Sequence, residues 1–311
     1  MGSSAASTAP VGVILYDRPH TIRRVLRAVS AYRPDRLYLI ADAPPETGGP
    51  AARRCQAARR AAEEAVTWPC EIHKLYADTH LGCRHRPTSG ISALFEQEEA
   101  AILLEDDCLP SPSFFPFCAE LLARYRDDPS IMMISGSNRL KHRPKDERDY
   151  FFSRFSQIWG WATWRRAWRK YDTALTDWPA RKPDLERSTL PFEATRVLSA
   201  KLDEIAAGEL DAWDFGWMYT LALENGLSVV PARNLVRNIG FGLRATHTLN
   251  PLAGLCQPGL RSIEPPYRGP ETPSPDSVHD ERYNRRVYGS AGRLHARERA
   301  HRIARALIRS G

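Results

Sequence analysis

Three consecutive carboxylates, Glu105, Asp106 and Asp107, are the residues of this chain best suited to chemistry. They directly follow the apolar run Ala101–Leu104, which is typical of a buried strand. Adjacent carboxylates repel one another, and a hard divalent cation such as Mg²⁺ or Mn²⁺ relieves that repulsion because it prefers carboxylate and phosphate oxygens. A solvated acidic turn is the alternative. The position of the triplet at the end of an apolar run favours a metal site that takes a diphosphate.

Further polar side chains follow the other apolar runs near the N-terminus. They are Arg18, Asp42, His80, Arg84 and His85. An aspartate at the end of a strand accepts hydrogen bonds from a base or ribose, and an arginine forms charge-assisted bonds to a nucleotide. A turn aspartate and a solvated surface arginine are the corresponding alternatives, and the histidines are equally ambiguous.

Two aspartates, Asp211 and Asp214, lie at the predicted start of a helix over residues 214–224. An aspartate in this position is either a helix N-cap or a general base that takes a proton from an attacking hydroxyl. His247 follows a glycine-rich turn and is a candidate metal ligand or phosphate contact, although a lone histidine is more often structural.

Tryptophans cluster in the second half of the chain. The four that are candidates for a sugar-binding platform are Trp159, Trp161, Trp164 and Trp217. Tryptophan usually packs, and a structural cluster is the slightly favoured interpretation. The functional alternative is a platform for sugar rings, whose apolar C–H faces lie against aromatic faces.

The elements that must position these residues alternate between strand and helix. Strands are predicted at 11–16, 37–41, 70–76 and 101–104, and helices at 21–32, 51–66 and 87–98. This alternation predicts a parallel sheet with helices on both faces, in which ligands bind at the carboxyl ends of the strands. Beyond it we expect helices at 114–126, 195–207 and 214–224, strands at 131–134 and 227–230, and an exposed loop at 138–149.

Composition limits the function classes. The 311 residues are 42% hydrophobic and 26% charged, which excludes wholesale disorder. No apolar run is long enough to span a membrane, and MGSSAASTAP lacks the basic and apolar regions of a signal peptide. We therefore expect a cytoplasmic protein whose six cysteines are free thiols.

The net charge of +7 is concentrated at the C-terminus. Residues 282–311 contain nine arginines and a single acid, so the rest of the chain is close to neutral. This distribution argues against nucleic acid as the partner of the main body. A modest apolar stripe predicts that the tail is a helix, which either packs on the body or contacts anionic lipid at a membrane surface.

Several stretches together resemble a GT-A-fold glycosyltransferase of the nucleotide-diphospho-sugar transferase superfamily, and within it the N-acetylglucosaminyltransferase I type. The stretches are VILYDRPHTIRRVLRAVSAYRPD, LIAD, AAILLEDDCLPSPSFFPFCAELL, IWGWATWRRAW, WDFGWM and NIGFGLRATHT, which occur in this order over residues 11 to about 250. The resemblance implies an α/β GT-A fold with a mostly parallel, Rossmann-like central sheet flanked by helices, an acceptor-side half and a basic C-terminal tail.

The resemblance also implies roles for the residues at the strand ends. Asp107 would be the direct ligand of Mn²⁺ or Mg²⁺, with Asp106 and His247 as further candidates. The donor-binding set would be Arg18, Asp42, Arg84, His85, Glu105 and Asp106, with Asp42 on the nucleotide base.

Asp214 matches the catalytic base of the resembled family. The family's aspartate directly precedes a tryptophan, whereas Phe215 and Gly216 separate Asp214 from Trp217 here. Asp211 is therefore kept as the alternative base.

The resemblance divides the chain into four segments. They are a disordered N-terminus (1–10), a nucleotide-sugar-binding half (11–107), an acceptor-binding and catalytic half (108–255), and a Pro-rich linker with a basic helical tail (256–311).

The implied reaction is a metal-dependent, inverting transfer of a sugar from a nucleotide-diphosphate sugar to a hydroxyl of a glycan or small molecule. UDP is the nucleotide and N-acetylglucosamine the sugar that the resemblance favours, and polysaccharide biosynthesis is a fitting process. A metal-dependent nucleotidyltransferase is the alternative, but its glycine-rich phosphate loop is missing after the first strand, where the chain has Asp17, Arg18 and Pro19. A basic nucleic-acid-binding protein is a third possibility, which requires basic and aromatic residues on one exposed face.

Overall fold

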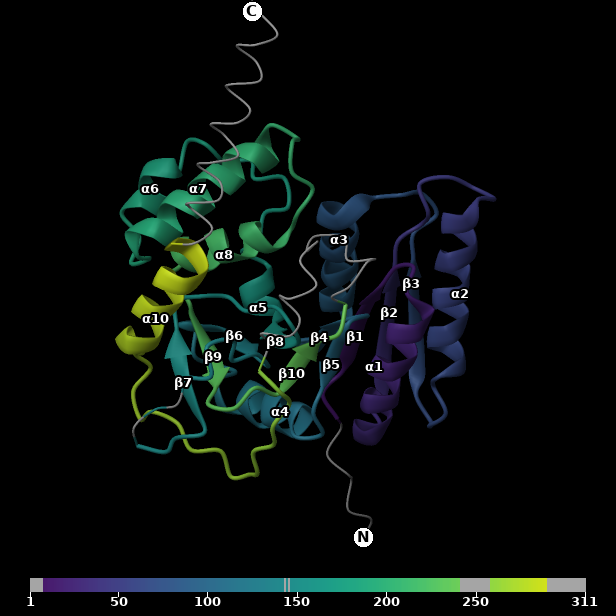
Figure 1. Cartoon of the computed structure of the whole chain (residues 1–311), viewed down its shortest axis with the longest axis horizontal. Coiled ribbons are helices and arrows are strands. Elements are labelled where there is room, and N and C mark those ends of the chain that lie inside the picture. The colour runs from purple at the N-terminus through teal and green to yellow at the C-terminus, as the bar shows by residue number, and fades with distance from the viewer. Residues whose placement is uncertain (1–7, 143, 145, 241–257, 290–311) are drawn as a thin grey trace, which may run out of the picture.

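The computed structural model of the chain describes residues 8–142, 144, 146–240 and 258–289. A central eight-stranded sheet has the strand order β3-β2-β1-β4-β8-β6-β9-β7 (Figure 1). Its strands are β1 (Val11–Leu15), β2 (Arg36–Ala41), β3 (Glu71–Tyr76), β4 (Ala100–Glu105), β6 (Ile131–Ser135), β7 (Tyr150–Ser153), β8 (Trp161–Trp164) and β9 (Leu227–Pro231). A short antiparallel pair, β5 (Cys108–Pro110) with β10 (Val236–Asn238), lies beside it.

The sheet is mostly parallel. β3, β2, β1 and β4 pair in parallel, as do β6 and β9, whereas β8 and β7 run antiparallel to their neighbours. The carboxyl ends of β1, β2 and β4 therefore meet at one edge, which brings together the polar residues that follow these strands.

Helices cover both faces of the sheet and form a lobe beside it. They are α1 (Pro19–Tyr32), α2 (Pro50–Glu64), α3 (Gly82–Gln97), α4 (Phe114–Arg124), α5 (Arg165–Trp168), α6 (Lys182–Glu186), α7 (Phe192–Ala206), α8 (Asp214–Leu223), α10 (Ser277–Tyr283) and the π-helical turn η1 (Asn284–Tyr288). The expected α/β class, a mostly parallel central sheet flanked by helices, is confirmed.

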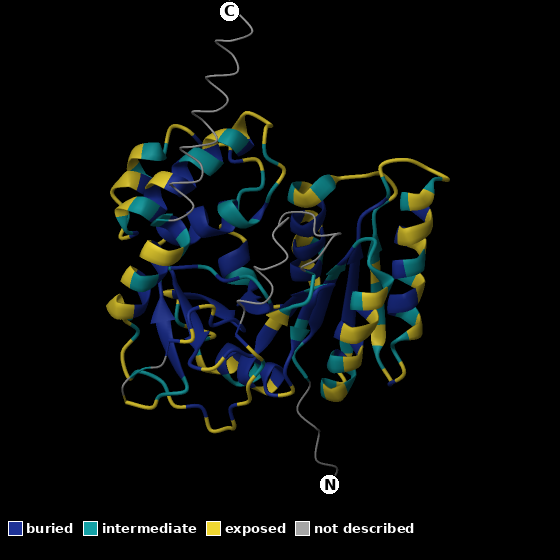
Figure 2. Ribbon diagram, in the orientation of Figure 1, coloured by how far each residue is buried: buried dark blue, intermediate teal, exposed yellow. Residues whose placement is uncertain are grey.

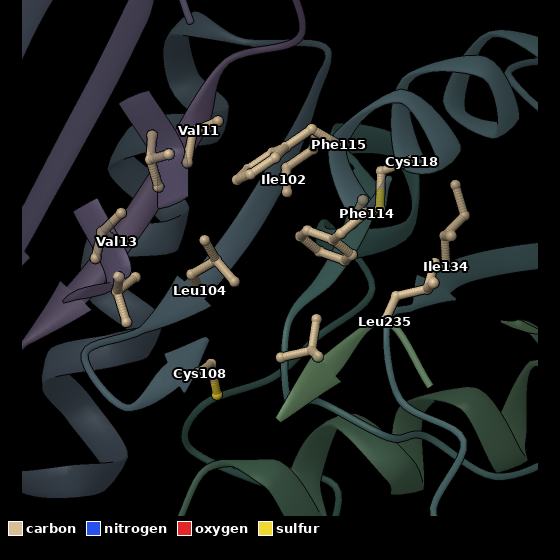
Figure 3. Close-up of a cluster of buried hydrophobic side chains, with 14 of the residues drawn as sticks. Val11, Val13, Ile102, Leu104, Cys108, Phe114, Phe115, Cys118, Ile134 and Leu235 are labelled. Atoms are coloured by element: carbon tan, nitrogen blue, oxygen red, sulfur yellow. The ribbon is translucent and has the colours of Figure 1, made fainter. Parts of the chain in front are cut away.

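Alternating side chains of the strands explain the two covered faces. In β4, Ile102 and Leu104 contribute to a core with α1, α2 and α4, whereas Ala101 and Leu103 contribute to one with α3, α5 and α8. Figure 3 shows Phe114 and Phe115 of α4 on the first face, and Figure 2 shows the buried strands between helices with exposed outer sides. Such two-sided burial explains why these strands are continuously apolar.

A third cluster of buried side chains lies in a helical lobe formed by α6, α7, α8, α10 and η1. Residues 258–289, expected as part of a linker and tail, pack on the body, since Ile263 and Tyr267 join the core of α4 and Tyr283 joins the lobe. Residues 1–7 and 290–311, which hold the expected disordered start and most of the basic tail, lie outside the described residues. In the described part of the chain, no helix has the length and apolarity needed to cross a membrane.

The sequence misplaced two helix starts and missed several short elements. α3 begins at Gly82, five residues before the predicted start at Pro87, and α7 begins at Phe192, three residues before the predicted start at residue 195. The strands β5, β7, β8 and β10 and the short helices α5 and α6 were not predicted.

Three of the four tryptophans considered as a sugar platform are buried. Trp161, Trp164 and Trp217 are 1%, 2% and 0% exposed, respectively. The rings of Trp161 and Trp217 lie 5.6 Å apart, and Trp213 stacks on Trp161 at 5.8 Å. Because their faces are covered by protein, these rings belong to the core. Trp159 is partly exposed and stays a candidate for the platform.

Replacing a core tryptophan is expected to cost much stability. Trp217→Ala should lower the free energy of unfolding by about 3–5 kcal/mol, because it removes a fully buried ring and leaves a cavity. Urea denaturation measures the loss, with Phe192→Ala as the control, since Phe192 is 75% exposed. A loss for Trp217→Ala no larger than that of the control would contradict its placement in the core.

Candidate functional site

The carboxylate triplet lies where β4 turns into β5, at the carboxyl edge of the sheet. Asp106 and Asp107 are buried, with 6% and 8% of their surface exposed. An Asp106 carboxylate oxygen accepts a hydrogen bond from the backbone N–H of Tyr16 at 3.2 Å. This bond joins the ends of β1 and β4, which are neighbours in the sheet.

Arg18 supplies a positive charge to the triplet. Its Nη1 lies 2.6 Å from Asp107 Oδ2 and 3.6 Å from Asp106 Oδ1. Arg18 follows β1 and lies at the carboxyl edge of the sheet, which is where the sequence predicted the residues after the strands to lie. One guanidinium beside three carboxylates leaves the site rich in negative charge.

Burial and mutual repulsion change the protonation of two of these acids. Burial, followed by the charges of Asp107 and Asp106, raises the pKa of Glu105 to about 8. Burial and the charge of Asp107 raise the pKa of Asp106 to about 7, against the opposing effect of Arg18. The protons held near neutral pH relieve the repulsion among the buried carboxylates. A bound divalent cation would relieve the same repulsion.

The atoms that could ligate a cation lie close together. One oxygen of Glu105, one of Asp107 and the sulfur of Cys108 lie within 4.8 Å of one another. Burial raises the pKa of the Cys108 thiol well above its usual range, and the thiol donates to Asp107 Oδ1 at 3.6 Å. Because the sulfur keeps its proton, the available ligands are carboxylate oxygens, which suit Mg²⁺ or Mn²⁺.

The segment after β10 closes over Asp107. Asn238 Nδ2 donates to Asp107 Oδ1 at 3.1 Å, and the backbone N–H of Ile239 donates to the Asp107 carbonyl at 2.7 Å. A Cβ at residue 240 would overlap the Asp107 carboxylate, which explains the glycine there. Sequence reasoning missed the role of Asn238, although it had noted the glycine-rich turn that begins at this residue.

Asp42 follows β2, and its carboxylate forms hydrogen bonds with other residues of the chain. Its carboxylate accepts hydrogen bonds from the backbone N–H groups of Leu81 at 2.9 Å and Gly82 at 2.8 Å, and His80 Nδ1 lies 3.0 Å away. Asp42 therefore anchors the start of α3 to the sheet. Its contact with a nucleotide base stays a prediction.

Asp211 anchors the same helix from the other half of the chain. Its two oxygens accept hydrogen bonds from the backbone N–H groups of Cys83 and Arg84, each at 2.7 Å. The Arg84 guanidinium in turn donates to the carbonyl of Thr173 at 2.6 Å. The left-handed Gly82 (φ 81°) permits this approach, because a Cβ there would overlap the Asp211 carboxylate.

Asp214 is the first residue of α8 and is half-buried. Its charge contributes to the raised pKa of Glu105 and to that of Tyr171, so it lies in the same electrostatic environment as the triplet. Asp214 thus stays a candidate base with an electrostatic influence on the triplet, whereas Asp211 is engaged with α3.

The remaining candidates have different surroundings. Trp159 is half-buried, with the Arg139 guanidinium 4.6 Å from its ring centre. His85 is exposed on α3, and His247 lies outside the described residues.

No protein-family model and no curated protein sequence matches this chain. Similar solved structures include a mannosyltransferase from Pyrobaculum calidifontis in complex with GDP-Man and Mn²⁺, at 12% identity and a TM-score of 0.41, covering 71% of this chain and 70% of that one. They also include an inositol-1-phosphate CTP transferase from T. maritima, at 10% identity and a TM-score of 0.40, covering 80% and 95%. A UDP-glucose pyrophosphorylase complexed with UDP-glucose has 8% identity and a TM-score of 0.35, covering 72% and 90%. Likeness at this level does not determine a reaction, so the function has to be inferred from the site.

Removing the Asp211 carboxylate is expected to weaken the start of α3. Asp211→Ala should lower the free energy of unfolding by about 1–2 kcal/mol, because two backbone N–H groups lose their acceptor. Asp211→Asn keeps one oxygen and should cost less. Urea denaturation measures both, with the exposed Glu209→Gln as the control. Equal stability of Asp211→Ala and the control would show that the cap contributes nothing.

The raised pKa values of Glu105 and Asp106 predict a pH dependence of stability. These carboxyls bind protons more tightly in the folded than in the unfolded chain, so the metal-free protein loses stability as pH rises from about 4 to about 8. Glu105→Gln should show a smaller loss over this range in thermal unfolding. At pH 8, Mn²⁺ should stabilise the native chain but not Asp107→Asn. Identical pH profiles for the native chain and Glu105→Gln would contradict the prediction.

Proposed function

We propose that this protein is a metal-dependent, inverting glycosyltransferase that moves a sugar from a nucleotide-diphosphate sugar to an acceptor hydroxyl. The observation that supports it best is the buried carboxylate triplet at the end of β4, with the Arg18 guanidinium against Asp107. Asp214, whose charge contributes to the raised pKa of Glu105, is the candidate general base beside such a metal-diphosphate site. The sequence resemblance favours UDP as the nucleotide and N-acetylglucosamine as the sugar.

The triplet fits a divalent cation. Glu105 and Asp107 would hold Mn²⁺ or Mg²⁺, with Asp106 beside them. Such a cation, when bound, offsets the negative charge of the diphosphate leaving group. Arg18 lies next to Asp107 and is placed to bind a phosphate oxygen through its guanidinium.

Asp42 and Arg84 contribute through α3. Both hold the start of this helix, Asp42 by accepting its N–H groups and Arg84 by binding the carbonyl of Thr173. We infer that they shape the donor side of the site in this way, with His85 exposed on the same helix.

Asp214 acts as the base. Its carboxylate takes the proton of the acceptor hydroxyl while the hydroxyl oxygen forms a bond to the anomeric carbon. The bond from that carbon to the phosphate oxygen breaks, and the nucleoside diphosphate leaves with the electron pair. Attack from the face opposite the leaving group, with one base and no enzyme nucleophile, inverts the anomeric configuration.

The end of β1 favours sugar transfer over nucleotidyl transfer. A nucleotidyltransferase typically cradles a triphosphate in a glycine-rich loop after its first strand. Here α1 begins at Pro19, and Tyr16 and Arg18, in the turn before it, bind the triplet instead. The turn contains no glycine.

The proposal predicts different losses for the metal ligand and the base. Asp107→Asn should abolish Mn²⁺-dependent donor binding in calorimetry. Asp214→Asn should bind the donor normally but lower transfer by about 10²–10⁴-fold, because only proton removal is lost. Glu209→Gln is the control, since it removes an exposed charge on the segment that leads to α8.

The assay incubates the protein with Mn²⁺ and a panel of UDP- and GDP-sugars and measures release of nucleoside diphosphate. Release of pyrophosphate from a nucleoside triphosphate in place of this activity would identify a nucleotidyltransferase. Near-normal transfer by Asp214→Asn would move the base elsewhere.

A further inference from the structure

A polar cavity is built from three segments of the chain, around residues 141, 232–234 and 258–261. Its volume is about 140 Å³, and the residues that line it are Lys141, Ala232, Arg233, Asn234, Pro258, Gly259 and Arg261. Three of these seven residues are cationic and none is acidic. The carboxylate triplet does not line this cavity, so it is a separate site.

Two buried asparagines hold the segments together. Asn138 donates from its side chain to the carbonyls of His142 at 2.7 Å and Pro231 at 3.0 Å. Its backbone N–H donates to the side-chain oxygen of Asn234 at 2.9 Å, and Asn234 donates to the carbonyl of Pro258 at 3.2 Å. These buried side-chain amides form hydrogen bonds with backbone groups of three loops. The bonds hold the wall of the cavity in place.

The Arg261 backbone completes the wall, because its N–H donates to the carbonyl of Asn234 at 2.9 Å. Lys141, which lines the cavity, has a left-handed backbone conformation with φ at 54°. A non-glycine residue rarely adopts this conformation, and such residues are concentrated at functional sites.

Lys141, Arg233 and Arg261 are exposed, and the described residues provide no acidic partner for them. Within the described residues, no carboxylate oxygen lies within 4.0 Å of a charged nitrogen of Lys141, Arg233 or Arg261. Arginines elsewhere, such as Arg36 with Glu98, do have such partners. Three cationic residues that line one cavity give it a positive potential, which attracts an anion.

We propose that this cavity binds an oxyanion, a phosphate or carboxylate group. Two guanidinium groups and one ammonium group offer charge-assisted hydrogen bonds to such a group, and arginine matches its planar or tetrahedral oxygens in a bidentate manner. The volume of about 140 Å³ exceeds the roughly 30 Å³ that one water occupies in the liquid, so there is room for a small anion.

The cavity lies on the segment that also reaches the triplet. Asn234 forms its wall, and Asn238 donates to Asp107. Four residues span at most about 14 Å. An anionic group of the acceptor, which on the proposed function binds on this side of the molecule, and free phosphate are the two sources of this chemistry.

Calorimetry with inorganic phosphate, on the full chain without donor, tests the site. Phosphate should bind, and Arg261→Gln and Arg233→Gln should each weaken binding about tenfold or more, because each removes hydrogen bonds to a charged group. Arg237→Gln is the matched control, since Arg237 is exposed on the same segment but does not line the cavity. Absence of phosphate binding, or an equal loss in the control, would overturn the proposal.

Acceptor kinetics distinguish the two sources of the anion. If the anion belongs to the acceptor, glucose 6-phosphate should have a lower KM than glucose in the nucleoside diphosphate assay, and Arg261→Gln should remove the difference. If it is free phosphate, added phosphate should change donor turnover while the two acceptors behave alike. A failure of all nucleotide sugars would refute the proposed transferase, whereas phosphate calorimetry would still decide the anion site.

Discussion

Repulsion among Glu105, Asp106 and Asp107 is the constraint around which the site is organised. The surrounding chain compensates it only in part: Arg18 binds Asp107, a backbone N–H binds Asp106, and Asn238 donates to Asp107. Two carboxyls still have pKa values raised to about 8 and about 7. The remaining negative charge makes the site suitable for a divalent cation and, through it, for a diphosphate.

The start of α3 connects the two halves of the molecule. Asp42, at the end of β2, and Asp211, just before α8, together accept four consecutive backbone N–H groups, those of residues 81 to 84. Asp211 is three residues before Asp214, so the bonds that cap α3 also set the position of the proposed base. Asp211 is committed to these hydrogen bonds, which leaves Asp214 as the aspartate proposed for the base.

The sequence predicted the parts of the fold that depend on local pattern. Two-sided burial made β1, β2 and β4 apolar throughout, and their ends carried Arg18 and the triplet as expected. The start of α3 was wrong because its cap comes from Asp211, more than a hundred residues away, while Pro87 imitates a first helical residue. Burial of Trp161 agrees with the slightly favoured structural interpretation of the tryptophan cluster, although local sequence alone does not separate a buried tryptophan from a sugar-binding one.

The segment from Arg233 to Gly240 links two sites of opposite charge. At one end Arg233 and Asn234 help to form a cationic cavity, and at the other Asn238 and Gly240 fit around Asp107. The acidic end attracts phosphate only after a cation is bound, whereas the cationic end attracts an anion directly. If the proposed anion site belongs to the acceptor, an anionic group of that substrate is held at the cationic end of the segment and kept from the carboxylate triplet, which repels it until a cation is bound.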